Sequence, residues 1–244
     1  AGMVMHVFDV GQGSAVLLQS RQRNGLYDTG PRFGRYTVMQ GQILPALHRM
    51  AVDTLDYVWV SHHDSDHSGG WPRLKKTLPV GEAFLPNNGG CYRGRKWQLG
   101  DLAIEALWPP QEHALKKPNN RSCTLLIEVA GVRVLLPGDI EASAERSLLA
   151  QGLPAVDVLF VPHHGSKTSS SQAFVDALRP RYIIVESGYA NRYGHPLERV
   201  LARYDAYGAT LFWTARDGAI RVRVSELGAL EISSSRRERP SFWH

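Results

Sequence analysis

The feature that most limits the fold of this chain is a series of short apolar runs, many of them β-branched, that recurs from one end to the other. Runs of four to eight residues with this composition are typical of β-strands. They lie at Met3–Val10, Ala15–Gln19, Leu55–Ser61, Cys123–Ala130, Val132–Leu136, Val156–Val161, Tyr182–Val185 and Ala209–Trp213. The early runs follow one another in the manner of hairpins, so the sequence predicts strands along its whole length.

Stretches with helical spacing separate the later runs. They lie at Val38–Met50, Glu141–Gln151, Ser170–Leu178 and Pro196–Tyr207. Each of the last three stretches stops at a glycine or proline, where helices typically end. Because strands alternate with helices in the second half, the sequence predicts a layered α/β or α+β domain rather than an all-β fold.

The composition is that of a globular protein. Hydrophobic residues make up 43% and charged residues 21% of the 244 residues, which excludes a disordered chain, a collagen-like repeat and a coiled coil. The longest nearly apolar stretch is interrupted by Glu128 and Arg133, so we expect no transmembrane helix, and the N-terminus lacks the pattern of a secretion signal. We expect a single domain at residues 1–232 and a basic, poorly ordered tail at residues 233–244.

Potential metal ligands gather directly after the apolar run at residues 55–60. Within six positions the chain offers two imidazoles and two carboxylates, at His62, Asp64, Asp66 and His67. A loop at the end of a strand lets such side chains point to one side, and this ligand set suits a pair of divalent ions. A polar turn that caps a helix would need only one of them. The segment therefore predicts a metal site.

Two ions need roughly six to eight protein ligands, so other segments must contribute. Asp139 follows the run Val132–Leu136 in a Gly-Asp pair and is placed to act as a bridging carboxylate; alternatively, it caps the helix expected at residue 141. His195 lies in a Tyr-Gly-His-Pro loop before a helix and is a second candidate ligand, with helix capping as the alternative.

In this order, the residues resemble the metallo-β-lactamase fold superfamily. That superfamily is identified by an Asp in a D-x-G turn, an H-x-H-x-D-H cluster, a third His, a Gly-Asp after a strand, and a last His. The matching positions in this chain are Asp28, His62, Asp64, Asp66, His67, Asp139 and His195. The resemblance implies a four-layered αββα sandwich of two mixed sheets, with the metal site at one edge. In it, Asp28 supports a ligand imidazole and does not bind metal itself.

Two departures from that pattern concern the choice of metal. Asp64 stands in place of the second His of the cluster, and Asn119 or Asn120 stands about 20 residues before Asp139, where another His is expected. Replacement of imidazole by oxygen ligands shifts the preference from zinc toward manganese or magnesium. We therefore expect one or two divalent ions, with manganese preferred and zinc or magnesium as alternatives.

The same departures resemble one branch of the superfamily, the C-terminal domain of the ComEC-type DNA-internalisation competence proteins. The segments that mark this branch occur here in order, at residues 9–14, 62–67, 119–122, 137–139, 163–166 and 193–196. The resemblance implies a metal-dependent phosphodiesterase or nuclease that degrades one strand of DNA during uptake in natural transformation. It also implies that the remainder of a membrane channel protein is a partner. The domain would then lie on the extracytoplasmic, periplasmic face of a bacterial inner membrane and be soluble when isolated.

The pair His163-His164 follows the run Val156–Val161 and offers either ligands or catalytic groups. By analogy with phosphodiesterases of the superfamily, we expect catalytic roles for Asp66, His163 and His164. In this assignment, His163 donates a proton or contacts phosphate, while His195 binds metal. The reverse assignment, with His163 as ligand and His195 as the catalytic group, stays open.

Two further segments offer substrate contacts or support for the site. Ser166 and Lys167 precede a helix expected at residue 170, which indicates either an anion site or ordinary helix capping. Asp9 and Gln12 flank a glycine-rich turn that either approaches the metals or only closes a hairpin.

The net charge of +5 and the pI of about 9.3 favour an anionic partner without requiring one. Cations and an aromatic ring alternate at Arg93, Arg95, Lys96 and Trp97, which is typical of a platform for single-stranded nucleic acid. A solvated loop with a partly buried Trp97 explains the same residues.

Two other functions stay open at this point. One is the hydrolysis of a small ester, thioester or lactone on the same fold, and the other is a non-catalytic nucleic-acid-binding module that holds metal poorly. Cys91 and Cys123 lie 32 residues apart without a zinc-binding spacing, so they form either one disulfide or two free thiols.

Overall fold

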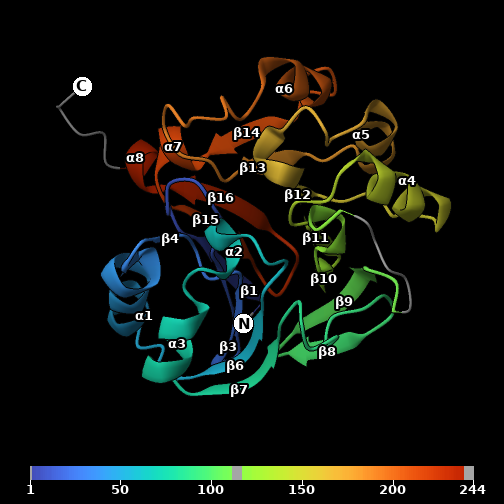
Figure 1. The fold of residues 1–244 in the computed structure, drawn as a ribbon. Coiled ribbons are helices and arrows are strands. Elements are labelled where there is room, and N and C mark those ends of the chain that lie inside the picture. Colours follow the sequence, from blue (N-terminus) through green and yellow to red (C-terminus); the bar gives the residue numbers. More distant parts are fainter. Residues whose placement is uncertain (1, 112–116, 239–244) are drawn as a thin grey trace.

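The computed structural model describes residues 2–111 and 117–238, in which two sheets pack face to face (Figure 1). The first sheet has the strand order β16-β15-β1-β2-β3-β6-β7. Its strands are β1 (Met3–Val7), β2 (Val16–Ser20), β3 (Arg23–Tyr27), β6 (Leu55–Trp59), β7 (Val80–Phe84), β15 (Ile220–Val224) and β16 (Leu230–Ser234). Antiparallel hairpins join β1 to β2 and β2 to β3, whereas β3, β6 and β7 are parallel.

The second sheet has the strand order β14-β13-β12-β11-β10-β9-β8. Its strands are β8 (Lys96–Leu99), β9 (Leu102–Trp108), β10 (Thr124–Val129), β11 (Val132–Leu136), β12 (Val158–Phe160), β13 (Tyr182–Val185) and β14 (Thr210–Trp213). The strands from β8 to β11 pair antiparallel and those from β11 to β14 pair parallel, so this sheet is mixed. A small separate hairpin consists of β4 (Arg32–Phe33) and β5 (Tyr36–Thr37).

Helices cover the outer face of each sheet (Figure 1). Those on the first sheet are the π-helical turn η1 (Met39–Ile43), α1 (Leu44–Arg49) and α3 (Trp71–Thr77); those on the second are α4 (Ala142–Ala150), α5 (Gln172–Leu178) and α6 (Glu198–Asp205). Short turns complete the described fold: α2 (Ser65–Ser68), η2 (Asn119–Arg121), η3 (Pro162–Gly165), α7 (Thr214–Asp217) and α8 (Ser235–Glu238). The expected αββα sandwich is confirmed.

The buried hydrophobic side chains form three clusters, one between the two sheets and one under each layer of helices. Side chains from the inner faces of both sheets, such as Met5, Trp59 and Val134, form the central cluster. Separate clusters lie under the helices of the first sheet, around Leu47, and under those of the second, around Phe174. The apolar runs of the sequence become strands because burial on both faces of each sheet needs apolar side chains on both sides of the strand.

The tail expected at residues 233–244, after a domain at residues 1–232, does not begin at residue 233. Ser233 and Ser234 are the last residues of β16, and Arg236 and Arg237 lie in α8. Both arginines are bonded, Arg236 to Asp9 and Arg237 to Asp217. The remaining residues of the expected tail, 239–244, lie outside the described part of the chain.

Cys91 and Cys123 form a disulfide that ties the loop before β8 to the start of β10, which decides between the two alternatives left open. In the described ranges, no helix is long and apolar enough to cross a membrane.

Candidate metal centre

The candidate site lies where the carboxyl ends of β6, β11 and β12 meet between the two sheets. The chain leaving β6 carries His62 and then α2, the chain leaving β11 carries Asp139, and η3 follows β12 and carries His163 and His164. A backbone hydrogen bond from Cys123 N to Ser61 O joins the two sheets at this edge.

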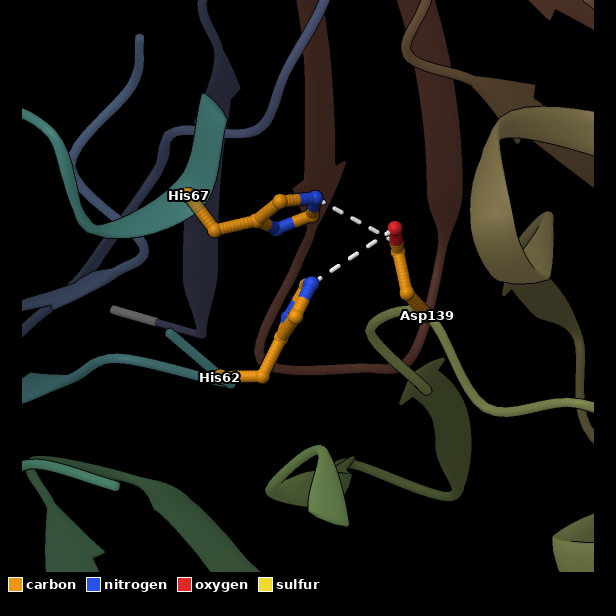
Figure 2. Close-up of side chains that lie close together, drawn as sticks. All are labelled: His62, His67 and Asp139. Carbon is orange, nitrogen blue, oxygen red and sulfur yellow. Dashed lines mark ion pairs between the residues drawn. The ribbon is translucent and has the colours of Figure 1, made fainter. Parts of the chain in front are cut away.

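The carboxylate of Asp139 is the centre of the cluster. Its Oδ1 lies 3.3 Å from His67 Nε2 and its Oδ2 lies 3.6 Å from His62 Nε2, and Figure 2 shows both imidazoles pointing toward this carboxylate. His62 and His67 are each 1% exposed and Asp139 is 3% exposed. These three side chains form one group with the spacing of metal ligands.

A second group shares His67 with the first and adds Asp66 and His164. His164 Nε2 lies 3.1 Å from His67 Nε2, 3.4 Å from Asp66 Oδ2 and 3.5 Å from Asp139 Oδ2. The two groups therefore form one continuous cluster of three imidazoles and two carboxylates.

The hydrogen bonds at Nδ1 show that the three imidazoles fit metal binding through Nε2. His67 Nδ1 donates to Asp28 Oδ2 at 2.7 Å, and His164 Nδ1 donates to the Glu186 carbonyl at 2.6 Å. Ser61 Oγ donates its proton to Asp28 and therefore accepts from His62 Nδ1 at 2.9 Å. Each neutral ring then has its lone pair on Nε2.

The surroundings of Nε2 support the same conclusion. His62 Nε2 is buried and has no hydrogen-bond partner among the described residues. His67 Nε2 and His164 Nε2 lie at hydrogen-bond distance from each other. In the neutral rings neither of these atoms carries a proton, so no hydrogen bond forms between them. One or two divalent cations held by the two groups of potential ligands would satisfy these atoms, since imidazole nitrogen and carboxylate oxygen are ordinary metal ligands.

The metal-free cluster compensates its charges by proton binding. Burial alone would lower the pKa of His67, but the charges of Asp139 and Asp28 raise it well above its usual value. Burial likewise opposes protonation of His164, whose pKa is nevertheless raised by Asp139 and Asp66. Burial would raise the pKa of Asp139, yet the adjacent imidazoles hold it well below its usual range.

We expect the affinity of the metal-free protein for a divalent ion to rise with pH. His67 and His164 must each release a proton before Nε2 binds metal, so below their folded-state pKa values the dissociation constant should fall about tenfold per pH unit for each proton released. Calorimetry in buffers of different ionisation enthalpy counts these protons. His48→Gln, at an exposed position, is the control and should not change the count.

The stability of the metal-free protein should depend on pH in the opposite sense. The raised pKa values of His67 and His164 stabilise the fold below the unfolded value of about 6.5, and this contribution is lost as pH rises through the folded-state values. Metal binding without proton release, together with flat stability over this range, would contradict the charge compensation.

Three residues at the site have left-handed backbone conformations. The φ angles are +60° at Asp28, +51° at His163 and +55° at His164. Such angles are uncommon for residues other than glycine and concentrate at functional sites, where the surrounding structure holds them. In this chain, they aim Asp28 and the histidine pair at the cluster.

The structure does not place His195, an expected ligand, in either group of potential ligands. Its ring lies 6.0 Å from the ring of His163 and stacks on Tyr193. His164, expected to be catalytic, lies in the second group of potential ligands. The candidate ligand differs from the one expected because the main chain of η3 directs His164 toward Asp139. His195, in the later loop, does not reach either group.

Two further candidates, Asp64 and His163, lie at the edge of the cluster. Asp64 Oδ2 is 3.6 Å from His62 Nε2 on a half-exposed side chain. His163 Nε2 is 3.8 Å from Asp139 Oδ2, and its ring is held by Thr168 Oγ1 and by Asn119 Nδ2. Burial lowers the pKa of His163, so the metal-free protein holds this ring neutral at pH 7.

The glycine-rich turn lies directly against the segment that carries the ligands. Ser14 N donates to Asp66 O, and a Cβ on Gly13 would lie 2.3 Å from that same oxygen, so this close approach requires glycine. Gln12 Oε1 accepts from Gly188 N, and Asp9 pairs with Arg236. The turn closes the β1–β2 hairpin and also supports α2.

The two asparagines have different roles. Asn119 contacts His163, whereas Asn120 Oδ1 accepts from Glu141 N and its Nδ2 donates to Ser143 Oγ at the start of α4. Asn119 therefore faces the site, and Asn120 holds the helix.

The anion site expected around Ser166 and Lys167 is not supported. Helix α5 begins at Gln172, and the backbone N–H groups of Ser170 and Ser171 donate to the carboxylate of Glu145. A protein carboxylate already occupies this position. Ser166 Oγ is bonded to Thr168, and Lys167 is exposed.

The expected nucleic-acid platform at residues 93–97 needs correction at Trp97. This side chain is 8% exposed and packs against Trp59 and Phe84 in the central core, so it offers no free face to a base. Arg95 lies over the Phe84 ring, and Lys96 pairs with Glu105. The structure leaves Arg93 near the surface without an aromatic platform.

Glu186 is a site residue that sequence reasoning missed. It follows β13, and its carboxyl group lies beside a small cavity lined by Tyr27, His67 and His164. Burial raises the pKa of Glu186 to about 7. A carboxylate directly after an apolar strand was the available signal, the same one that identified Asp139.

Comparisons with known proteins agree with this fold. The sequence model of the metallo-beta-lactamase superfamily matches residues 8–89. Competence protein ComA of Neisseria gonorrhoeae is 36% identical over 91% of this chain and 32% of its own length. Recombination protein 2 of Haemophilus influenzae is 36% identical over 93% of this chain and 29% of its own length. The chain thus spans about a third of the curated relatives it matches.

A solved structure shows the same architecture. The metallo-beta-lactamase fold protein YhfI of Bacillus subtilis superposes with a TM-score of 0.55 and 13% sequence identity, over 95% of this chain and all of YhfI. At this identity, the likeness concerns the fold alone.

Proposed function

We propose that this chain, which has the metallo-beta-lactamase fold and matches the sequence model of that superfamily over residues 8–89, is a metal-dependent nuclease that hydrolyses phosphodiester bonds of DNA. The observation that carries the proposal is the cluster around Asp139, in which three imidazole nitrogens and two carboxylates converge at the meeting edge of two sheets. The competence relative with 36% identity supports DNA as the substrate and DNA uptake as the process.

His62, His67, His164, Asp66 and Asp139 would hold one or two divalent ions, with Asp64 beside them. When bound, the metal lowers the pKa of water and neutralises charge on the phosphate oxygens. Asp28, Ser61 and the Glu186 carbonyl orient the three imidazoles through Nδ1, and such support typically changes metal affinity by roughly 10- to 100-fold.

His163 is the proposed proton donor to the leaving oxygen. Thr168 Oγ1 and Asn119 Nδ2 hold its ring beside Asp139, and about a fifth of its side chain remains exposed. Its pKa is lowered in the free protein, and the negative charge of a bound phosphodiester would raise it again. Protonation would therefore follow substrate binding, which is when a general acid is needed.

Basic side chains border the cluster. Lys117 pairs with Glu141 beside His163, and Lys167 and Arg192 are exposed on the adjoining loops. Their charges favour a polyanionic substrate over the small ester, thioester or lactone considered from the sequence, and the intact ligand cluster favours catalysis over simple binding. We propose single-stranded DNA as the preferred form.

We also propose that the chain acts as one domain of a larger DNA-uptake protein in an oxidising compartment. The relatives are about three times its length. The disulfide between Cys91 and Cys123 persists outside the reducing cytosol. Both observations support a position on the periplasmic side, beside the remainder of a channel protein.

We expect the manganese-loaded protein to cleave a labelled single-stranded DNA faster than the zinc-loaded protein at matched occupancy. Asp64 places a carboxylate beside the cluster where an imidazole would favour zinc. The test reconstitutes metal-free protein and measures cleavage and bound metal together. Asp64→His should move the preference toward zinc, and chelation should stop cleavage.

Faster cleavage by the zinc form would contradict the argument from ligand type. Absence of DNA cleavage with manganese, zinc and magnesium, all verified as bound, would overturn the proposed nuclease. A parallel assay on nitrophenyl esters tests the alternative substrate class under the same conditions.

A further inference from the structure

Exposed aromatic side chains lie on two segments of the chain that contact the segments of the metal centre. In the described part of the chain, the large hydrophobic side chains with strong exposure are Phe33, Tyr36, Tyr189, Tyr193, Tyr207 and Leu227. Four of these six lie in two segments, the hairpin at residues 32–37 and the loop at residues 187–196, which we call the tyrosine loop. Burial of aromatic rings is favourable, so such exposure needs an explanation.

The tyrosine loop is held rigidly by one asparagine. Asn191 Oδ1 accepts from the backbone N–H groups of Tyr193 and His195, and its Nδ2 donates to the carbonyls of Gly188 and His195. Ser187 Oγ also donates to the His195 carbonyl. The aromatic rings are therefore presented by an ordered loop, which reduces the entropy lost when they bind a partner.

The loop is attached directly to the metal centre. Leu197 N, just after it, donates to Gly165 O, next to His164. The His195 ring lies 6.0 Å from the His163 ring. Tyr193 stacks on His195 with ring centres 5.6 Å apart and planes 22° apart, and the Arg192 guanidinium lies 4.7 Å from the Tyr193 ring centre. A row of flat groups thus leads outward from His163.

Tyr189 is the freest of these rings. Its side chain is 85% exposed, and it makes no hydrogen bond or ring contact with any residue in the described ranges. Both faces of the ring are available to a flat ligand, whereas the Tyr193 ring is already in contact with His195 and Arg192.

The hairpin adds aromatic and basic groups from another part of the sequence. A Cβ on Gly69 would lie 2.6 Å from Arg32 N, so the hairpin contacts the end of α2. Gly30 N, before the hairpin, donates to Ser14 O, and Gly188 N donates to Gln12 Oε1. The hairpin and the tyrosine loop therefore border the same glycine-rich turn.

The charge of both segments is positive. The hairpin contains Arg32 and Arg35, the tyrosine loop contains Arg192, and neither contains an acidic residue. Exposed aromatic rings between arginines match the chemistry of single-stranded nucleic acid, whose bases stack on rings while its phosphates contact cations.

We propose that the tyrosine loop is a base-stacking platform that holds single-stranded nucleic acid beside the metal centre, with Tyr189 and the Arg192–Tyr193 pair as its stacking groups. The inference rests on the proposed nuclease function and deepens it. Bases of a single strand have free faces, whereas those of a duplex are already stacked and paired. The platform therefore selects single strands and keeps the backbone next to His163.

The test measures binding without cleavage. Metal-free protein is titrated into a fluorescent single-stranded 12-mer in the presence of chelator, and anisotropy gives the dissociation constant. Tyr189→Ala and Tyr193→Ala should each weaken binding by roughly 5- to 150-fold, the range typical of one lost stacked base. Tyr189→Phe and Tyr193→Phe keep the ring and should bind within twofold of the original protein.

Tyr207→Ala is the matched control, because Tyr207 is 42% exposed but bonds Asp176 of α5 instead of bordering the metal centre. It should leave the affinity unchanged. A 12-mer with abasic sites distinguishes stacking from charge: its affinity should be lower for the original protein and insensitive to both alanine substitutions.

The outcomes separate this inference from the proposed nuclease. If both alanine variants bind the 12-mer as tightly as the original protein, or if the original protein does not bind it, the platform is refuted even when the metal-loaded protein cleaves DNA. If binding depends on the tyrosines and no metal-loaded form cleaves DNA, the platform stands and the nuclease falls.

Discussion

Asp139→Ala is expected to abolish DNA hydrolysis, lowering kcat roughly 10⁴-fold or more. Asp139 contacts His62, His67 and His164 at once. Its loss therefore removes the carboxylate that contacts all three imidazoles of the cluster. Metal-based activation contributes several kcal/mol of transition-state stabilisation, and about 5.5 kcal/mol corresponds to that factor. Asp66→Ala is expected to act in the same direction.

The measurement combines single-turnover cleavage with metal content. Asp139→Asn keeps the shape of the side chain, and circular dichroism of both variants shows whether the fold is retained. Asp53→Ala, at an exposed position before β6, is the control and should cleave normally. Survival of more than a few per cent of activity in a folded Asp139→Ala protein would remove this residue from the mechanism.

His164→Ala and His195→Ala are expected to fail in different ways. His164 Nε2 lies within 3.5 Å of both cluster carboxylates, so its loss should weaken metal affinity by roughly 100-fold or more, beyond the effect of a supporting residue. Excess metal should restore part of the activity. His195 lies outside both ligand groups, so its loss should leave metal affinity within about threefold.

The activity of His195→Ala should fall only modestly. Burial and the neighbouring imidazoles lower the pKa of His195 to about 4, so this ring is neutral at assay pH and supports His163 and Tyr193 without donating a proton. Calorimetric titration of both variants with manganese decides the assignment. Loss of metal from His195→Ala but not from His164→Ala would restore the ligand set expected from the sequence.

Much of the fold could be predicted because it depends on local patterns. The runs at Val132–Leu136 and Tyr182–Val185 became β11 and β13 with unchanged bounds. Strands with few apolar residues could not be recognised in this way. β3 reads Arg-Asn-Gly-Leu-Tyr and is a strand because it pairs between β2 and β6. β15 reads Ile-Arg-Val-Arg-Val, an alternation that is itself typical of a strand, and was not among the expected runs.

The candidate site divides in the same manner. His62, Asp66 and His67 lie within one short segment, and a strand end followed by a tight turn leaves their side chains little choice of direction. Trp97 illustrates the opposite case. Its neighbours in sequence are basic, but Trp59 and Phe84 from the other sheet cover it, and no local pattern contains that information.

The sequence by itself determined the fold class, the chemistry of the ligands and the segment in which most of them lie, because these follow from periodicity and residue type. Only the tertiary structure decided which histidine completes the cluster, which tryptophan is buried and which tyrosines stay exposed. His163 and His164 are neighbours in the chain and both have left-handed backbone angles, yet only His164 lies between Asp66 and Asp139, whereas His163 lies at the edge of the cluster. Direction and burial depend on contacts between distant segments, which residue order alone does not specify.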